Sequence, residues 1–267
     1  MKTRQMLSIL TLLAICLFTN AQEKLHCSYE DCDFTKGEVV YLFGDDVLLR
    51  EAPTVESKIL GKLEIGTHMV ILEKHKNSWP YKGIDSHFYK VDYKGTEGYI
   101  LGGLIALEKK TVHGVTHLFG RAKSAQQDYL LIRTLKGDGK FTEKSVRLDN
   151  PQFYLTVQGN KGLSQIDAML YVDYVAEGCG VEGGRIYFFQ KEDSLYQVAR
   201  LSKIFDAGVY AIQEEFIFPE DEDGIEGKIR YTKELAEYYD DAANWEKKSL
   251  ESKELIWTNH SLGLAQR

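Results

Sequence analysis

The sequence predicts an all-β protein in which a small barrel precedes an antiparallel β-sandwich or meander domain with one possible helix. Apolar residues alternate with polar ones in many short runs, which is the period of half-buried strands. Turn sequences rich in Gly, Asn and Asp separate these runs at close spacing, as in other all-β folds. The 267 residues suit two domains, each large enough to bury a core.

Composition excludes several classes of protein. Hydrophobic residues make up 43% of the chain and four residues are proline, which excludes a disordered or collagen-like chain. Asp and Glu number 40 against 33 for Lys and Arg, and the sequence has no basic cluster. Phosphate contacts need clustered cations, so we expect no nucleic-acid partner.

The first 21 residues have the pattern of a secretory signal peptide. Lys2 and Arg4 give a positive start, and the apolar stretch Met6–Phe18 is too short to span a membrane as a mature helix. We therefore expect an exported protein, periplasmic or secreted, with no transmembrane segment in the mature chain. Cleavage takes the formal net charge from −7 to −9, since the leader holds two bases and no acids. Lipidation of Cys16 is an alternative that the sequence leaves open.

Export changes the interpretation of the cysteines. In an oxidising compartment, the neighbouring Cys27 and Cys32 predict a local disulfide that staples the mature N-terminus. A zinc site that includes His26 is the alternative, but the fold would have to supply its fourth ligand. Cys179 lies between two glycines and no helix follows it to favour the thiolate, so we expect a buried thiol in a tight loop rather than a nucleophile.

Residues 39–107 form the predicted barrel. Six short apolar runs follow one another there, and natural turn sequences such as Gly44-Asp45-Asp46 separate them. Alternation at such close spacing suits short strands that fold over one core. The chain thus divides into a leader (1–21), an N-terminal segment (22–38), the barrel (39–107) and a β-rich C-terminal domain (108–267).

Residues 47–72 resemble the opening of the bacterial SH3 domain. The family pattern runs through an Arg, a Pro, a short polar loop and two glycines, and the matching residues are Arg50, Pro53, Gly61 and Gly66. Residues 88–104 look like the closing hairpin of the family, with Tyr99 where a Trp is usual. The connection from Lys74 to His87 is longer than the usual one. The resemblance covers roughly 70 residues, about a quarter of the chain.

The resemblance implies a groove lined with aromatic rings that grips a peptide of the cell wall. By analogy with the family, the candidate ligand-binding residues are Trp79, Tyr81, Phe88 and Tyr99. Alternation along the hairpin puts Phe88 and Lys90 on one face and Tyr89 and Val91 on the other, so one aromatic set is less buried. The alternative is that these rings cover the core that so small a barrel needs.

Residues 108–267 resemble no family that we can name, but their pattern stays β-rich. The helical candidate is Thr232–Ser252, because apolar and aromatic residues recur there at steps of three and four. Leu255–Trp257 follows as an expected last strand. His113 and His117 would lie about 13 Å apart on a strand, too far to share one metal, so we expect surface histidines.

These observations favour an exported, non-catalytic binding protein of the cell envelope, whose partner is cell-wall peptide or an envelope protein. No nucleophile–base pair, paired carboxylates, phosphate loop or metal signature stands out. We therefore expect no enzyme activity, no cofactor and no metal. Two alternatives stay open: a cell-wall hydrolase with its active site in the C-terminal domain, and a structural component of an envelope assembly.

Overall fold

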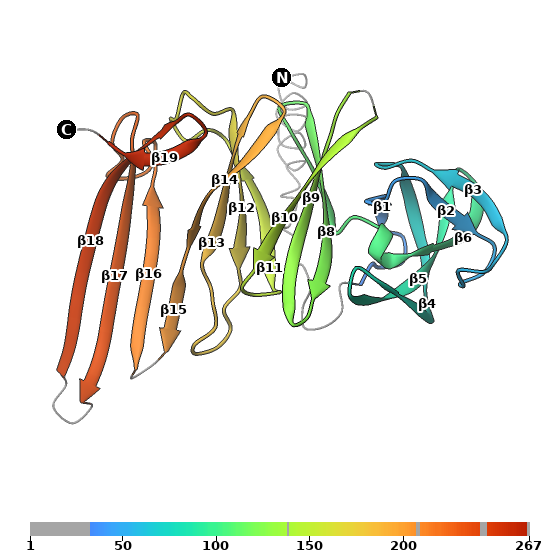
Figure 1. Cartoon of the computed structure of the whole chain (residues 1–267), viewed down its shortest axis with the longest axis horizontal. Helices are drawn as coiled ribbons and strands as arrows, with labels where there is room; N and C mark the ends of the chain where they lie inside the picture. Colours follow the sequence, from blue (N-terminus) through green and yellow to red (C-terminus); the bar gives the residue numbers. More distant parts are fainter. Residues whose placement is uncertain (1–32, 138, 207–208, 241–244, 266–267) are drawn as a thin grey trace, which may run out of the picture.

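The computed structural model describes residues 33–265, except for 138, 207–208 and 241–244 (Figure 1). The predicted signal peptide, Cys16 and the predicted Cys27–Cys32 disulfide lie outside the described residues. Within these residues every regular element is a strand, apart from the single 3-10 turn η2 (Gly102–Leu104), which confirms the all-β prediction. The described chain holds no helix long and apolar enough to cross a membrane.

The first six strands form one curled antiparallel sheet, with the order β1-β4-β5-β6-β2-β3. Their bounds are β1 (Val39–Tyr41), β2 (Val47–Arg50), β3 (Ile59–Leu63), β4 (His68–Tyr81), β5 (Ile84–Tyr93) and β6 (Thr96–Leu101). Alternate side chains such as Tyr89, Val91 and Ile100 point into a core that this sheet closes on itself. Phe34, from the segment before β1, fills the end of that core with its ring centroid 5.3 Å from that of Tyr89.

Three further antiparallel sheets follow, each a meander of strands consecutive in sequence. Sheet 1 consists of β7 (Glu108–Val112), β8 (Val115–Ser124), β9 (Gln127–Leu135) and β10 (Phe141–Leu148). Sheet 2 consists of β11 (Phe153–Gln158), β12 (Ala168–Tyr174), β13 (Arg185–Lys191) and β14 (Ser194–Leu201). Sheet 3 consists of β15 (Lys203–Asp206), β16 (Tyr210–Ile217), β17 (Ile229–Asp240), β18 (Trp245–Thr258) and β19 (Ser261–Leu264). The predicted sandwich or meander is thus three meanders.

The sheets stack in chain order behind the barrel, so the molecule is elongated with the barrel at one end (Figure 1). Each junction has its own apolar cluster: Phe43 of the barrel packs with Leu118 of sheet 1, and Phe119 of sheet 1 packs with Phe188 of sheet 2. Sheet 2 packs through its other face on Trp257 of sheet 3. Strand β12 is therefore buried on both faces, with six of its seven residues inaccessible.

The predicted helix at Thr232–Ser252 is wrong. The segment belongs to β17 and β18, which pair antiparallel with Leu235 opposite Ser249 and Glu234 opposite Leu250. Steps of four keep residues on one face of a strand as well as of a helix, and packing of Tyr231 and Leu255 on sheet 2 decides for the strand. The expected last strand, Leu255–Trp257, is the end of β18, and β19 follows it.

His117 is a second correction, because it is fully buried rather than on the surface. Its Nε2 lies 3.1 Å from Oε1 of Gln190 in sheet 2, and its Nδ1 lies 2.9 Å from the hydroxyl of Thr134. The Gln190 amide nitrogen donates to the Val112 carbonyl, so its oxygen accepts and His117 carries its proton on Nε2. Burial lowers the pKa of His117, which favours the neutral ring that this network requires.

Candidate functional site

Three of the four predicted ligand-binding rings lie on the outer face of the barrel. Cross-strand partners share a face, and the pairs there are Trp79–Ser86, Phe88–Leu101 and Lys90–Tyr99. Residues 86, 88 and 90 of β5 alternate with Tyr89 and Val91, whose side chains lie in the core. Trp79, Phe88 and Tyr99 therefore share one face of the sheet.

The three rings differ in how far they are exposed to solvent. Phe88 is 2% exposed and has no accessible ring surface for a ligand, so the core alternative holds for this residue. Trp79 is 45% exposed, and Tyr99 is half-buried with its ring centroid 5.9 Å from the edge-on ring of His75. The part of this face that is open to solvent is thus Trp79 with the neighbouring Tyr99–His75 pair.

A bulge in β4 shapes this face. Lys74 pairs with Tyr89 and Ser78 pairs with His87, so between these two pairs β4 advances by four residues and β5 by two. Asn77 in the bulge donates from its amide nitrogen to the Pro53 carbonyl at 3.2 Å. Sequence reasoning missed His75 and Asn77 as neighbours of the rings. The signal for them was the unusual length of the Lys74–His87 connection.

Tyr81, the fourth predicted ring, shares this face of the sheet through its pair with Ile84, but it lies at the tip of the β4–β5 hairpin, next to sheet 1. It lines a small cavity of about 80 Å³ beside sheet 1, and a Cβ on Gly103 would lie 2.7 Å from its ring. Burial raises the pKa of Tyr81. Directly after it, the Lys82 carbonyl accepts a hydrogen bond of 2.8 Å from the backbone N–H of Lys123 in sheet 1. Tyr81 therefore belongs to the joint between barrel and stack.

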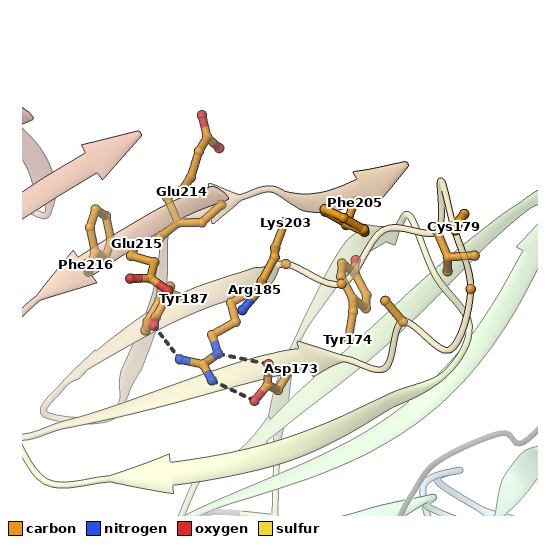
Figure 2. A pocket seen from close by; sticks show the side chains of 16 residues that line it. Asp173, Tyr174, Cys179, Arg185, Tyr187, Lys203, Phe205, Glu214, Glu215 and Phe216 are labelled. Atoms are coloured by element: carbon orange, nitrogen blue, oxygen red, sulfur yellow. Dashed lines mark hydrogen bonds and ion pairs between the residues drawn. The ribbon is translucent and has the colours of Figure 1, made fainter. Parts of the chain in front are cut away.

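A cavity of about 750 Å³ opens between sheets 2 and 3 (Figure 2). Arg185 lies on its sheet-2 wall and donates two hydrogen bonds, of 2.9 and 3.0 Å, to the Asp173 carboxylate. A third, of 3.4 Å, reaches the Tyr187 hydroxyl. Burial by itself lowers the pKa of Arg185, but the hydrogen bonds to Asp173 and Tyr187 raise it overall.

Two carboxylates hold the crossover where the chain passes from sheet 2 to sheet 3 beside this cavity. Glu182 accepts hydrogen bonds from the Ser202 hydroxyl at 2.6 Å and the Lys203 N–H at 3.0 Å. Glu214 accepts from the Ser202 N–H and the Tyr231 hydroxyl, both at 2.8 Å. Burial by itself raises the pKa of Glu214, but these bonds and Lys233 lower it overall. Glu214 is therefore held in its charged form, and both carboxylates fasten the crossover at Ser202.

The prediction of a buried Cys179 is wrong, because the residue lies at the cavity on the exposed loop between β12 and β13, and its thiol is free. This loop covers the edge of β15, because Gly180 and Gly183 donate their N–H groups to the carbonyls of Phe205 and Lys203 at 3.0 and 2.9 Å. Among the described residues, no group of three or more His, Cys, Asp and Glu side chains is placed to hold a metal ion.

Comparison with protein families matches residues 45–106 to the bacterial SH3 domain. The match spans β2 to β6, which carry Trp79, Phe88 and Tyr99, and it confirms the resemblance seen in the sequence. Comparisons with curated proteins and with solved structures found no match. The barrel is thus a bacterial SH3 domain, and the family match ends where the three-sheet stack begins.

Proposed function

We propose that this is an exported, non-catalytic binding protein of the cell envelope whose barrel captures cell-wall peptide or a protein partner. Bacterial SH3 domains commonly bind cell-wall material. The observation that carries the proposal is the 45% exposure of Trp79 on the outer face of such a domain. Large exposed indoles are costly in water and supply much of the energy of binding sites.

The joint between barrel and stack supports this surface. Tyr81 and Lys82 fasten the tip of the β4–β5 hairpin to sheet 1, while Trp79, two residues earlier, stays uncovered by the stack. The stack therefore fixes the orientation of the barrel without closing its outer face. A ring held on an anchored hairpin loses little conformational entropy when a ligand binds.

Export rests on the leader pattern of residues 1–21 and fits a domain type that is often extracellular. In this reading the stack is a rigid spacer that holds the barrel away from whatever the other end contacts. Its length in Figure 1 suits that role, since sheets 1 and 2 lie between the barrel and sheet 3.

Co-sedimentation of the full chain with purified sacculi tests the proposal. We expect the protein to pellet with them and Trp79→Ala to lose at least about 10-fold in affinity, the loss of one well-placed aromatic anchor. Leu250→Ala, which removes an exposed apolar side chain at the far end of the stack, serves as control and should bind normally. Binding that survives Trp79→Ala, or no binding by the unaltered chain, contradicts the proposal.

A further inference from the structure

The cavity between sheets 2 and 3 is a candidate binding site of its own, distinct from the barrel. We propose that it takes a short peptide that carries a free carboxylate at one end and a free amino group at the other. The inference assigns a second site and does not depend on the proposed role of Trp79.

The cavity has the size and lining of a ligand site. Its volume of about 750 Å³ lies within the range of roughly 300–1,000 Å³ that such sites occupy. Tyr187 lines its sheet-2 wall and is buried. Phe205 is 58% exposed and Val181 is 38% exposed, and both also line the cavity. An occupant would cover these two apolar side chains, which favours a ligand with small apolar groups.

The charges of the lining do not all cancel within the protein. Asp173 is neutralised by Arg185, and Glu214 is neutralised by Lys233 at 3.2 Å. Two charges are left over in the cavity, one of each sign. Across the described chain, the Lys203 ammonium makes no ion pair or hydrogen bond, and the Glu215 carboxylate meets the neutral amide of Gln213 at 2.6 Å but no cation.

The positive side of the cavity is equipped for a carboxylate. Lys203 and Arg185 face each other across it, from β15 and β13 (Figure 2). A guanidinium has five N–H donors, of which Asp173 takes two and Tyr187 one, so Arg185 keeps two. The ion pair with Asp173 holds the guanidinium plane in place, and a fixed plane of donors suits a carboxylate better than a mobile one.

The negative side is suited to an ammonium group. Glu215 comes from β16 and extends toward the Tyr187 side of the cavity in Figure 2. A ligand with one negative and one positive end neutralises both leftover charges. A purely anionic ligand pairs with Lys203 alone, and the Glu215 carboxylate repels it. The hydrogen bonds of Glu182 and Glu214 to the crossover preorganise the wall that carries Lys203.

The test uses the full chain, ¹⁵N-labelled, and trialanine as the probe. We expect amide shifts to move in the β12–β13 loop and in β15, at probe concentrations below about 10 mM. Trialanine with an amidated carboxyl end and N-acetylated trialanine should each bind at least about 10-fold more weakly, because each lacks one of the two charges. Equal binding of all three peptides, or no shifts at all, overturns the proposal.

Two variants assign the ends of the peptide. Lys203→Met should weaken the binding of trialanine and leave the binding of the amidated peptide nearly unchanged. Glu215→Gln should also weaken the binding of trialanine and leave that of the acetylated peptide nearly unchanged. Lys247→Met, an exposed lysine of sheet 3 outside the cavity, is the matched control and should change nothing. Variants that bind trialanine as the unaltered protein does would contradict the site.

Trp79→Ala separates this inference from the proposed function. It should abolish co-sedimentation with sacculi while trialanine shifts in β15 stay the same. If trialanine instead moves shifts on the barrel, the cavity proposal is overturned and the barrel surface gains support.

Discussion

The barrel and the three-sheet stack bury their apolar side chains in opposite ways. The barrel curls one sheet until its strands share a core, and every member of that core lies between Phe34 and Ile105. No sheet of the stack has a core to itself, because each apolar cluster there joins neighbours, as Phe119 with Phe188 or Phe189 with Trp257. The barrel can therefore be recognised as a unit, whereas each sheet depends on the next.

This difference predicts how damage spreads. A core substitution in the barrel should act within it, while one at a junction of the stack removes contacts from two sheets at once. Urea unfolding followed by the indole N–H signals of the ¹⁵N-labelled chain can separate these cases, since Trp79 reports on the barrel and the buried Trp257 reports on the stack.

Phe188→Ala should have the largest effect. Phe188 is fully buried between sheets 1 and 2, and its removal should cost about 4–5 kcal/mol of the free energy of unfolding, most of it in the stack. The Trp257 transition should move to much lower urea than the Trp79 transition. Equal movement of both would show that barrel and stack unfold as one unit, and Phe205→Ala, an exposed ring, is the control.

Phe88→Ala should cost about 3 kcal/mol and lower the barrel transition. Its ring was predicted to bind ligand, but its 2% exposure makes it a packing residue. Trp79→Ala, on the same face, should change stability by less than about 0.5 kcal/mol. A variant Phe88→Ala that is as stable as the parent in urea would return this ring to the list of ligand contacts.

Arg133→Met should loosen the joint between barrel and stack, at a cost of about 2 kcal/mol. The guanidinium lies 4.4 Å from the ring centroid of Phe43 and 4.3 Å from that of Phe141, and it donates to the Phe43 carbonyl at 2.6 Å. The two urea transitions should move apart. Arg133→Lys should not rescue the joint, because an ammonium cannot stack in the same plane while it donates; full rescue would contradict this account.

The smallest effect concerns pH and His117. Burial lowers the pKa of this ring below its ordinary value near 6.5, so as the pH falls the unfolded chain binds a proton at His117 before the native chain does. The stabilising contribution is complete above pH 6.5 and is lost as pH falls from there toward the native pKa. Melting temperatures between pH 7 and 5 should fall less in His117→Asn than in the parent. An equal fall in both would remove His117 from the explanation.

The sequence predicted the barrel well because its signals are local. Alternation, the Gly44 turn and the spacing of Arg50, Pro53, Gly61 and Gly66 all act within short stretches, and the family match at residues 45–106 agrees. The separation of Phe88 and Lys90 from Tyr89 and Val91 followed from alternation alone. The burial of Phe88 could not, because alternation does not say which outer rings a bulge or a neighbouring segment covers.

The stack was predicted less completely because contacts between its sheets, rather than local sequence, decide the structure of its segments. Residues 232–252 carry a pattern compatible with helix or strand, and contact with sheet 2 selects the strand. Nothing in the sequence around His117 indicated that the side chain would be buried against Gln190, 73 positions away. The cavity likewise gathers Arg185, Lys203 and Glu215 from three strands of two sheets, a meeting that no spacing encodes.

The most direct test of the central claim is hydrogen exchange of the full chain, followed by mass spectrometry, with and without bound sacculi. The account predicts slower exchange in residues 74–81 and 96–101, around Trp79 and Tyr99, and no change in strands β7 to β10 of sheet 1. Trp79→Ala should erase the difference. Protection that appears in sheet 1 while these barrel segments stay unchanged would contradict the claim that the outer face of the barrel is the binding surface.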